Sequence, residues 1–263
     1  MADKINNTLT KTSTCTPPKN YGKKGCCMKL EKPPQKPDPA IYSQQEIISQ
    51  GMIPTWNNPD IITNHWNEWT LDKEPEVTIK NLSTTTAAIN TRVTFSYAQF
   101  GIGFNKIQVS SQLIHVPAGG AVNIKFPLPQ TLADGPPNIS TWVDITHSSD
   151  SRLTNNAGMQ TVFGAHTSKV GRHPTFTFPV YNNTAVAQNI SLVTYANELS
   201  AIITPNTFQL SAFEQRMVNI QLHVPDHLHA ASSENLMKEV SVAAFTQQGI
   251  LVGGLTYIIK IDN

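Results

Sequence analysis

Charged residues are scarce in this sequence, because only 14% of its 263 residues are Asp, Glu, Lys or Arg. The 19 basic residues nearly balance the 18 acidic ones, which leaves a formal net charge of +1. A protein that binds nucleic acid needs a basic surface to neutralise phosphates. We therefore expect no nucleic-acid partner, while a hydrophobic fraction of 39% is sufficient to form real cores.

Long hydrophobic runs are also absent. No stretch of about 18 apolar residues occurs, so we expect no transmembrane helix. The first residues, Met1–Thr8, lack the apolar segment of an ordinary secretory signal peptide. We expect synthesis in the cytoplasm, with the protein either remaining in the cell or ending in an extracellular or particle-associated assembly.

Cysteine is limited to Cys15, Cys26 and Cys27, so no cysteine is available to crosslink the rest of the chain. A zinc site needs about four ligands, and no histidine lies near these three thiols. Two readings stay open. The thiols are reduced, or Cys15 forms a disulfide crosslink with Cys26 or Cys27.

Catalytic motifs are missing as well. The sequence has no Gly-x-Ser-x-Gly motif, no paired-acid motif and no phosphate-binding glycine loop. One cluster could bind a divalent metal, with the aspartate orienting an imidazole; it consists of His223, Asp226, His227 and His229. Pro225 interrupts the strand there, and solvated histidines are the alternative. We predict no catalytic residue, no cofactor and no enzymatic activity.

What the sequence does contain is a strong alternation of apolar and polar residues, which begins near residue 76. Val93, Phe95 and Tyr97 show it in the first half, and Phe176 and Phe178 begin it again in the second. Such alternation is typical of antiparallel strands buried on one face. We predict an all-β fold of two consecutive Ig-like antiparallel β-sandwiches, at 76–165 and 166–263.

Between these halves, residues 147–160 are rich in Ser, Asp, Asn and Gly. These residue types favour turns, because their short polar side chains bond to the local backbone and Gly or Asn tolerates a positive φ. We interpret this stretch as the last hairpin of the first sandwich and the hinge into the second.

The N-terminal part, residues 1–40, differs in composition, since lysines from Lys11 to Lys36 are interleaved with prolines from Pro17 to Pro39. Proline removes backbone donors, and so polar a segment cannot bury enough surface to fold alone. We predict an extended or disordered arm, or alternatively an arm that orders against a neighbouring subunit. Residues 41–75 are predicted to be a linker with a short helix that ends at Gly51 and a tryptophan-rich segment.

Three tryptophans, Trp56, Trp66 and Trp69, lie within fourteen residues of this linker. Tryptophan buries a large area and needs one polar partner, so these side chains can plug the end of a sandwich. The alternative is a platform on which sugar rings stack, to which Trp142 would also contribute.

The first half resembles the bacterial cell-adhesion-related Ig-like domain called CARDB. The resemblance covers residues 76–165 and rests on Ala118–Gly120, Val122–Phe126, Trp142–Ile145, Asp150 and the Asn155–Asn156 pair. It implies an Ig-like sandwich in which the Asn-Asn pair ends the penultimate turn.

The second half resembles the Ig-like domains that accompany secreted glycosidases. The residues concerned are Phe178–Asn182, Phe208–Ala212, His223–Pro225 and Gly253–Gly254. Domains of this kind act as spacers, adhesive modules or docking surfaces. The resemblance therefore implies a role in protein–protein interaction or cell adhesion.

These observations predict a non-enzymatic structural or binding protein. We expect a subunit of, or an accessory to, a larger bacterial or phage assembly, such as a filament, an injection particle or a surface adhesive structure. It would act through its sandwich surfaces and N-terminal arm, with protein partners or by self-association, because edge strands need a partner or protection. The alternative is a carbohydrate-binding adhesin that uses exposed tryptophans.

Overall fold

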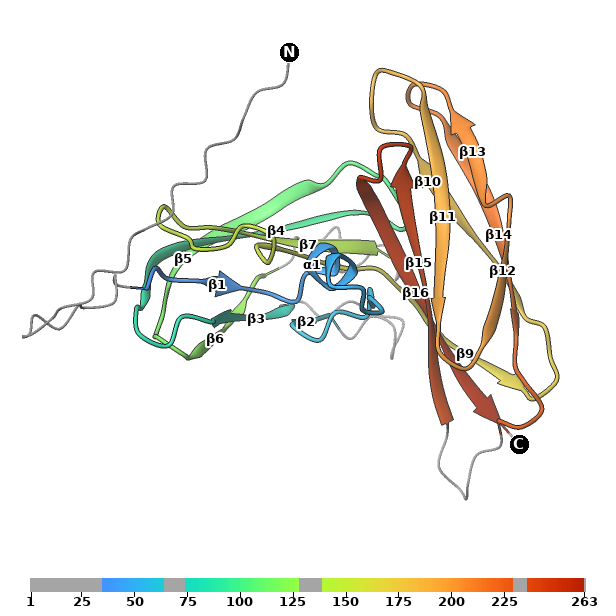
Figure 1. Ribbon diagram of the computed structural model, residues 1–263, viewed down its shortest axis with the longest axis horizontal. Helices are drawn as coiled ribbons and strands as arrows, with labels where there is room; N and C mark the ends of the chain where they lie inside the picture. Colours follow the sequence, from blue (N-terminus) through green and yellow to red (C-terminus); the bar gives the residue numbers. More distant parts are fainter. Residues whose placement is uncertain (1–34, 64–73, 128–138, 229–235, 263) are drawn as a thin grey trace, which may run out of the picture. The chain divides into compact units, whose positions relative to one another are not determined.

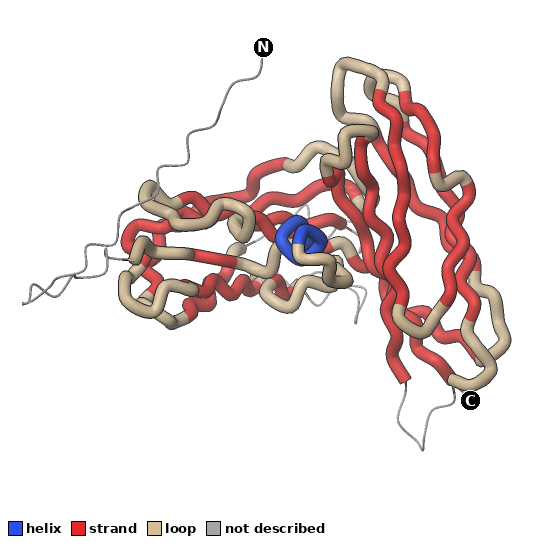
Figure 2. Tube along the Cα trace, in the orientation of Figure 1, coloured by secondary structure: helices blue, strands red, loops and turns tan. Residues whose placement is uncertain are grey.

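Strands make up most of the regular structure in the computed structural model, which describes residues 35–63, 74–127, 139–228 and 236–262 (Figure 1). Figure 2 shows the same distribution, with one short helix among the described residues. The predicted all-β fold class is confirmed. The predicted arm lies largely outside the described residues.

The first sandwich consists of two sheets. In one sheet β3 (Glu76–Asn81) pairs along one edge with β6 (Ala121–Lys125), and along the other with β1 (Pro39–Ala40) and β2 (Ile61–Ile62). The second sheet is antiparallel in the order β5-β4-β7-β8. Its strands are β5 (Ile107–Val116), β4 (Ala88–Gln99), β7 (Ile139–Thr146) and β8 (Ala157–Gln160).

Alternation along these strands forms the first core. Val93 and Phe95 of β4 are fully buried, and the ring of Phe95 stacks on that of Phe126 with centroids 5.2 Å apart. Ile41 and Ile61 are buried in the same cluster. Residues 35–63, which the sequence placed in an arm and a linker, therefore supply both short strands and side chains to this sandwich.

The helix α1 (Gln44–Ser49) lies in this segment. The backbone N–H of Glu46 donates to the Ser43 hydroxyl at 3.5 Å, which caps the helix N-terminus. Gly51 follows the helix with φ +72°, a conformation that glycine adopts at little cost. No helix in the described part of the chain is long and apolar enough to span a membrane.

The second sandwich also has two sheets. One has the order β10-β14-β12, and the other has the order β13-β11-β15-β16-β9. The first three strands are β10 (Thr175–Tyr181), β14 (Gln215–His223) and β12 (Ser200–Thr204). The other five are β13 (Thr207–Leu210), β11 (Gln188–Ala196), β15 (Leu236–Thr246), β16 (Leu251–Asp262) and β9 (Val162–Lys169).

The strand β9 runs parallel to β16, whereas the other strand pairs of the described sheets are antiparallel. The chain leaves β8 at Gln160 and enters β9 at Val162, so it passes from one sandwich to the other at Thr161. Both backbone groups of Thr161 form hydrogen bonds. Its N–H donates to Trp56 O at 2.9 Å, and its carbonyl accepts from Thr256 N–H at 2.9 Å.

Aromatic rings fill one part of the second core. Tyr257 is fully buried, and its ring lies 4.7 Å from that of Phe176 and 5.3 Å from that of Phe163, measured between centroids. The Tyr257 hydroxyl has no hydrogen-bond partner, and burial raises the pKa of the group above its ordinary value. The phenol therefore stays neutral and unpaired in an apolar environment.

Replacing Tyr257 with phenylalanine is expected to raise the free energy of unfolding by about 1 kcal/mol, because it removes a buried hydroxyl that lacks a partner. Urea denaturation followed by circular dichroism measures the change. Tyr42, whose hydroxyl accepts from Thr55 N–H at 3.0 Å, provides the matched control. Tyr42→Phe is expected to lower stability, and a loss of stability in Tyr257→Phe would contradict the argument.

Candidate binding groove

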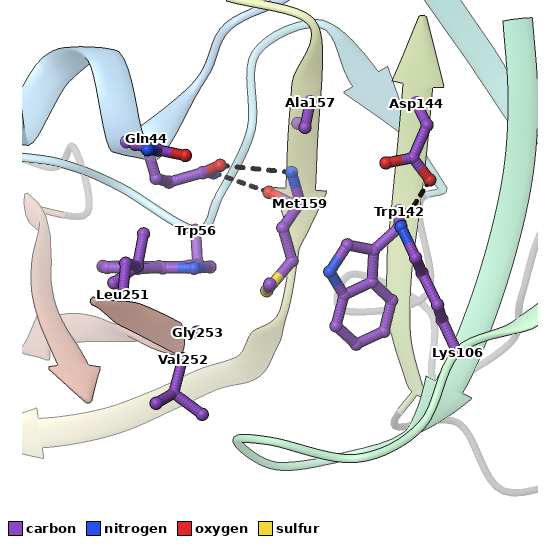
Figure 3. Close-up of a pocket in the computed structure, with 12 residues that line it drawn as sticks. Gln44, Trp56, Lys106, Trp142, Asp144, Ala157, Met159, Leu251, Val252 and Gly253 are labelled. Carbon is purple, nitrogen blue, oxygen red and sulfur yellow. Dashed lines mark hydrogen bonds and ion pairs between the residues drawn. The ribbon is translucent and has the colours of Figure 1, made fainter. Parts of the chain in front are cut away.

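Two adjoining hollows on residues 34–263, which pack as one compact unit, form the candidate site. The first has a volume of about 220 Å³ and is shown in Figure 3. The second has a volume of about 500 Å³. Both are lined by Lys106, Trp142, Leu251 and Val252. Because they share these residues, we treat them as one groove, called the Trp142 groove below.

The register of the sheet places Trp142 in this groove. Val143 and Ile145 of β7 point into the first core and are buried, so Trp142 and Asp144 must lie on the opposite face. Trp142 is opposite Ser96 of β4 and Met159 of β8. In Figure 3 its indole projects from β7 into the hollow between Met159 and Lys106.

One ion pair lies at the rim of the groove. Lys106 Nζ is 2.5 Å from Asp144 Oδ2, and both side chains are partly exposed. Such an exposed pair contributes little to stability, roughly 0–1 kcal/mol. The pair also sets the charge of the groove. Lys106 is the only cation and Asp144 the only carboxylate among the described lining residues, and they neutralise each other.

Gln44 closes the edge of β8 beside the groove. Its Nε2 donates to Met159 O at 2.6 Å, and its Oε1 accepts from Met159 N–H at 3.1 Å. The dashed lines in Figure 3 show this two-way contact. A side-chain amide thus occupies the backbone groups that an added strand would use. A ligand in the groove therefore cannot pair with the backbone of Met159 and can contact this edge only through side chains.

Trp56 forms the closed back of the first hollow. The side chain is fully buried, and Gly254 of β16 lies directly against its ring. The backbone N–H of Trp56 donates to Thr256 Oγ1 at 2.7 Å, whereas its indole Nε1 has no partner. A ring packed in this way presents no open face for a sugar. Trp66 and Trp69, the other predicted platform residues, lie outside the described residues.

The histidines predicted as metal ligands are arranged differently. The ring of His223 stacks on that of His173, with centroids 4.5 Å apart, and its Nδ1 is buried without a partner. Asp226 and His227 follow in a turn, and His229 lies outside the described residues. Within the residues that the structure describes, no three His, Cys, Asp or Glu side chains come together around a metal position. Cys15, Cys26 and Cys27 are not among the described residues.

Exposed amides surround Trp142 instead. Gln45 lines the first hollow, while Asn105 and Asn183 line the second. All three are exposed, and none has a side-chain partner within the described part of the protein. An amide both donates and accepts hydrogen bonds, so this lining combines an aromatic surface with free neutral hydrogen-bonding groups. Such a lining can stack on an apolar surface of a ligand and also form hydrogen bonds with its polar groups.

Comparison with known proteins gives little further information. No family model matches the sequence, and no curated protein matches it. The similar solved structures include a FixG-related protein from Vibrio parahaemolyticus, which is 18% identical over 35% of this chain and 80% of that chain, with a TM-score of 0.29.

Two further similar structures are the SrpA adhesin from Streptococcus sanguinis and a PapD-like domain of human CEP192. The adhesin is 20% identical over 36% of this chain and 53% of its own, with a TM-score of 0.28. The PapD-like domain is 10% identical over 38% and 80%, with a TM-score of 0.26. At such TM-scores these similarities carry no argument about function. The resemblances to CARDB and to glycosidase-associated Ig-like domains stay predictions.

Proposed function

We propose that this protein is a non-enzymatic structural or binding protein that works as a subunit of, or an accessory to, a larger bacterial or phage assembly. It engages protein partners, or further copies of itself, through open edges of its sheets and through its N-terminal arm. The observation that carries the proposal is the long uncharged edge strand β5.

The strand β5 has ten residues, none of which is Lys, Arg, Asp, Glu or Pro. It pairs with β4 on one side, and no strand of the described residues pairs with it on the other. Ile107 and Leu113 on this strand are 55% and 61% exposed. An open edge of this kind presents unpaired backbone groups beside apolar side chains, which is a template for adding a strand.

Other edges of the same protein are covered. Ile102 forms a parallel bridge with Val180 at the outer edge of β10. Its N–H donates to Pro179 O at 3.0 Å, and its carbonyl accepts from Tyr181 N–H at 2.9 Å. The edge of β8 is closed by Gln44. The outer edges of β10 and β8 are thus protected, whereas the outer edge of β5 is open. Proteins normally protect their long strand edges, so this difference supports a binding role for β5.

A second open edge lies in the other sandwich. The five residues of β12 are uncharged, and Ile202 at its centre is 65% exposed. Within the described residues β12 pairs only with β14. Each sandwich thus offers at least one uncharged edge, because the shorter edge strand β13 of the second sandwich is uncharged as well. One molecule therefore has more than one place at which a neighbouring chain can add a strand.

The double variant Ile107→Lys/Leu113→Lys is expected to weaken association by at least about tenfold, because charge on an edge strand opposes the addition of another strand. Analytical ultracentrifugation over a concentration series measures self-association. Pull-down from the source particle measures partner binding. The matched control is Leu153→Lys/Val186→Lys, whose two aliphatic side chains are 76% and 64% exposed but lie in turns.

Removal of residues 1–33 tests the arm in the same assays. The deletion must stop there, because Asp38 already belongs to the first sandwich. Its N–H donates to Asn81 Oδ1 at 3.1 Å, and its carboxylate accepts from Asn155 Nδ2 at 2.8 Å. A protein that is monomeric at every concentration, with partner binding unaffected by the edge variants and by the deletion, would contradict the proposed function.

A carbohydrate-binding adhesin is the second candidate function. Trp56 does not favour it, because no face of its ring is open. The observation that does favour it is the position of Trp142 among free amides.

A further inference from the structure

We propose that the Trp142 groove binds a neutral oligosaccharide. This inference gives the second candidate function its site and its ligand. The groove shares no residue with β5 or β12, so the inference stands or falls independently of the assembly role proposed first. Four features of the groove carry the inference: an accessible indole, free amides, a balanced charge and a blocked strand edge.

The indole of Trp142 supplies the apolar contact. It is partly exposed, and it stands between the two hollows with Leu251 and Val252 close by. A sugar ring has an apolar face of C–H groups that packs on the face of an aromatic ring. Because the groove extends to both sides of Trp142, a ligand that stacks there also reaches the polar groups on either side.

The free amides supply the polar contacts. Gln45 lies on one side of Trp142, and Asn105 and Asn183 lie on the other. Gln188 Nε2 donates to Thr184 Oγ1 at 3.1 Å, which places a further amide and a hydroxyl in the second hollow. A sugar hydroxyl both donates and accepts, and an amide meets both requirements without carrying charge.

The charge of the lining selects against ionic ligands. Lys106 and Asp144 are the only ionisable residues among the described lining residues, and they neutralise each other at 2.5 Å. An anionic ligand that approached Lys106 would meet the Asp144 carboxylate at once, and a cationic ligand that approached Asp144 would meet Lys106. The groove therefore fits a ligand without net charge.

The size of the groove fits more than one sugar ring. The first hollow alone, at about 220 Å³, is smaller than the roughly 300–1,000 Å³ of ordinary ligand sites. The second hollow, at about 500 Å³, lies within that range and shares its wall residues with the first. A ligand that occupies both hollows is therefore an extended molecule that crosses the indole.

The blocked edge of β8 argues against a peptide. An extended peptide normally adds to a sheet edge through its backbone, with side chains entering pockets on alternate positions. Gln44 already holds both the N–H and the carbonyl of Met159, the β8 residue that lines the groove. A peptide would have to lie in the groove without these main-chain bonds, whereas an oligosaccharide does not need them.

The experiment uses the full chain and five neutral hexasaccharides as probes: cellohexaose, laminarihexaose, maltohexaose, mannohexaose and fully N-acetylated chitohexaose. Isothermal titration calorimetry is run on the wild type and on Trp142→Ala, Trp142→Phe, Asn183→Ala and Asn219→Ala. Asn219 lies on β14, outside both hollows, so it is the matched amide control. Circular dichroism and the melting temperature show that each variant is folded.

We expect at least one probe to bind the wild type, and binding to fall tenfold or more in Trp142→Ala. Trp142→Phe keeps an aromatic face and is expected to be intermediate, Asn183→Ala to weaken binding several-fold, and Asn219→Ala to leave it unchanged. If Trp142→Ala does not fold, the other variants decide. No binding of any probe at millimolar concentration, or equal binding by all variants, would overturn the proposal. So would Trp142-dependent binding of arrayed peptides without binding of any sugar.

Discussion

Replacing Gly254 with alanine is expected to lower the free energy of unfolding by about 3 kcal/mol, because the new methyl group has no space. A Cβ atom at this position would lie 2.3 Å from Trp56 Cζ2 and 2.4 Å from Val242 O. The first is part of a buried ring and the second is backbone, so neither can move aside cheaply. The loss is measured by urea denaturation.

Gly249→Ala is the matched control for this experiment. No atom lies within 4 Å of a Cβ at Gly249, but φ is +76°, so the expected cost is about 1 kcal/mol of backbone strain alone. The double variant Trp56→Leu/Gly254→Ala should cost less than the sum of its two single changes, because the smaller side chain makes room for the methyl group. Equal losses for Gly254→Ala and Gly249→Ala would show that the Trp56–Gly254 contact is absent.

Asn182→Ala is expected to lower the free energy of unfolding by about 3 kcal/mol, because it leaves several partly buried backbone groups unpaired. Asn182 Nδ2 donates to Val186 O and to Ser211 O, both at 2.8 Å. Its Oδ1 accepts from Thr184 N–H at 3.1 Å. One side chain therefore holds the turn after β10 and ties it to the residue after β13.

The neighbouring Asn183 offers a control of the same residue type. It is exposed and has no side-chain partner, so Asn183→Ala should change stability by less than about 0.5 kcal/mol. Thermal denaturation of the two variants side by side gives the comparison. Similar melting temperatures for Asn182→Ala and Asn183→Ala would refute the role assigned to the Asn182 amide.

The first sandwich contains the same arrangement at Asn81, the last residue of β3. Its Nδ2 donates to Thr86 O at 2.9 Å and to Val116 O at 3.2 Å. Its Oδ1 accepts from Ser83 N–H at 3.1 Å. Both sandwiches thus use an asparagine at the end of a strand to build the turn that follows.

The alternation of apolar residues was enough to predict the all-β fold, because burial on one face of a strand leaves a direct trace in the sequence. Val93 and Phe95 in the first core, and Phe176 and Phe178 in the second, lie where the pattern placed them. The strand β7 shows the same pattern, since Val143 and Ile145 are buried on its inner face. Each of these predictions needed only neighbouring residues.

Features that depend on distant residues left no such trace. The strands β1 and β2 have two residues each, too few to show a period. The pairing of β9 with β16 joins residues about 90 positions apart. Asparagine is a residue type that favours turns, but the bond from Asn182 to Ser211 O depends on the fold.

The Trp142 groove likewise combines several separate segments. They include Gln44–Gln45 at the start of α1, Phe104–Lys106 before β5, Trp142 and Asp144 on β7, and Leu251–Gly253 at the start of β16. Trp142 was considered from the sequence as a sugar-stacking residue. The amides Asn105 and Asn183, however, are ordinary surface residues until the fold brings them to its sides.

The position of β16 determines when the second sandwich can be completed during synthesis. It is made after β9 and β15, both of which pair along it. It also carries Gly254 and Thr256, which meet the ring and the backbone N–H of Trp56 nearly 200 residues earlier. Until these dozen residues emerge, Trp56 lacks its contacts with Gly254 and Thr256, and β9 lacks the strand with which it pairs. A chain that ends before Leu251 would leave the second sandwich without β16 and Trp56 without its contacts to that strand, so the effect of the truncation would extend to the N-terminal half.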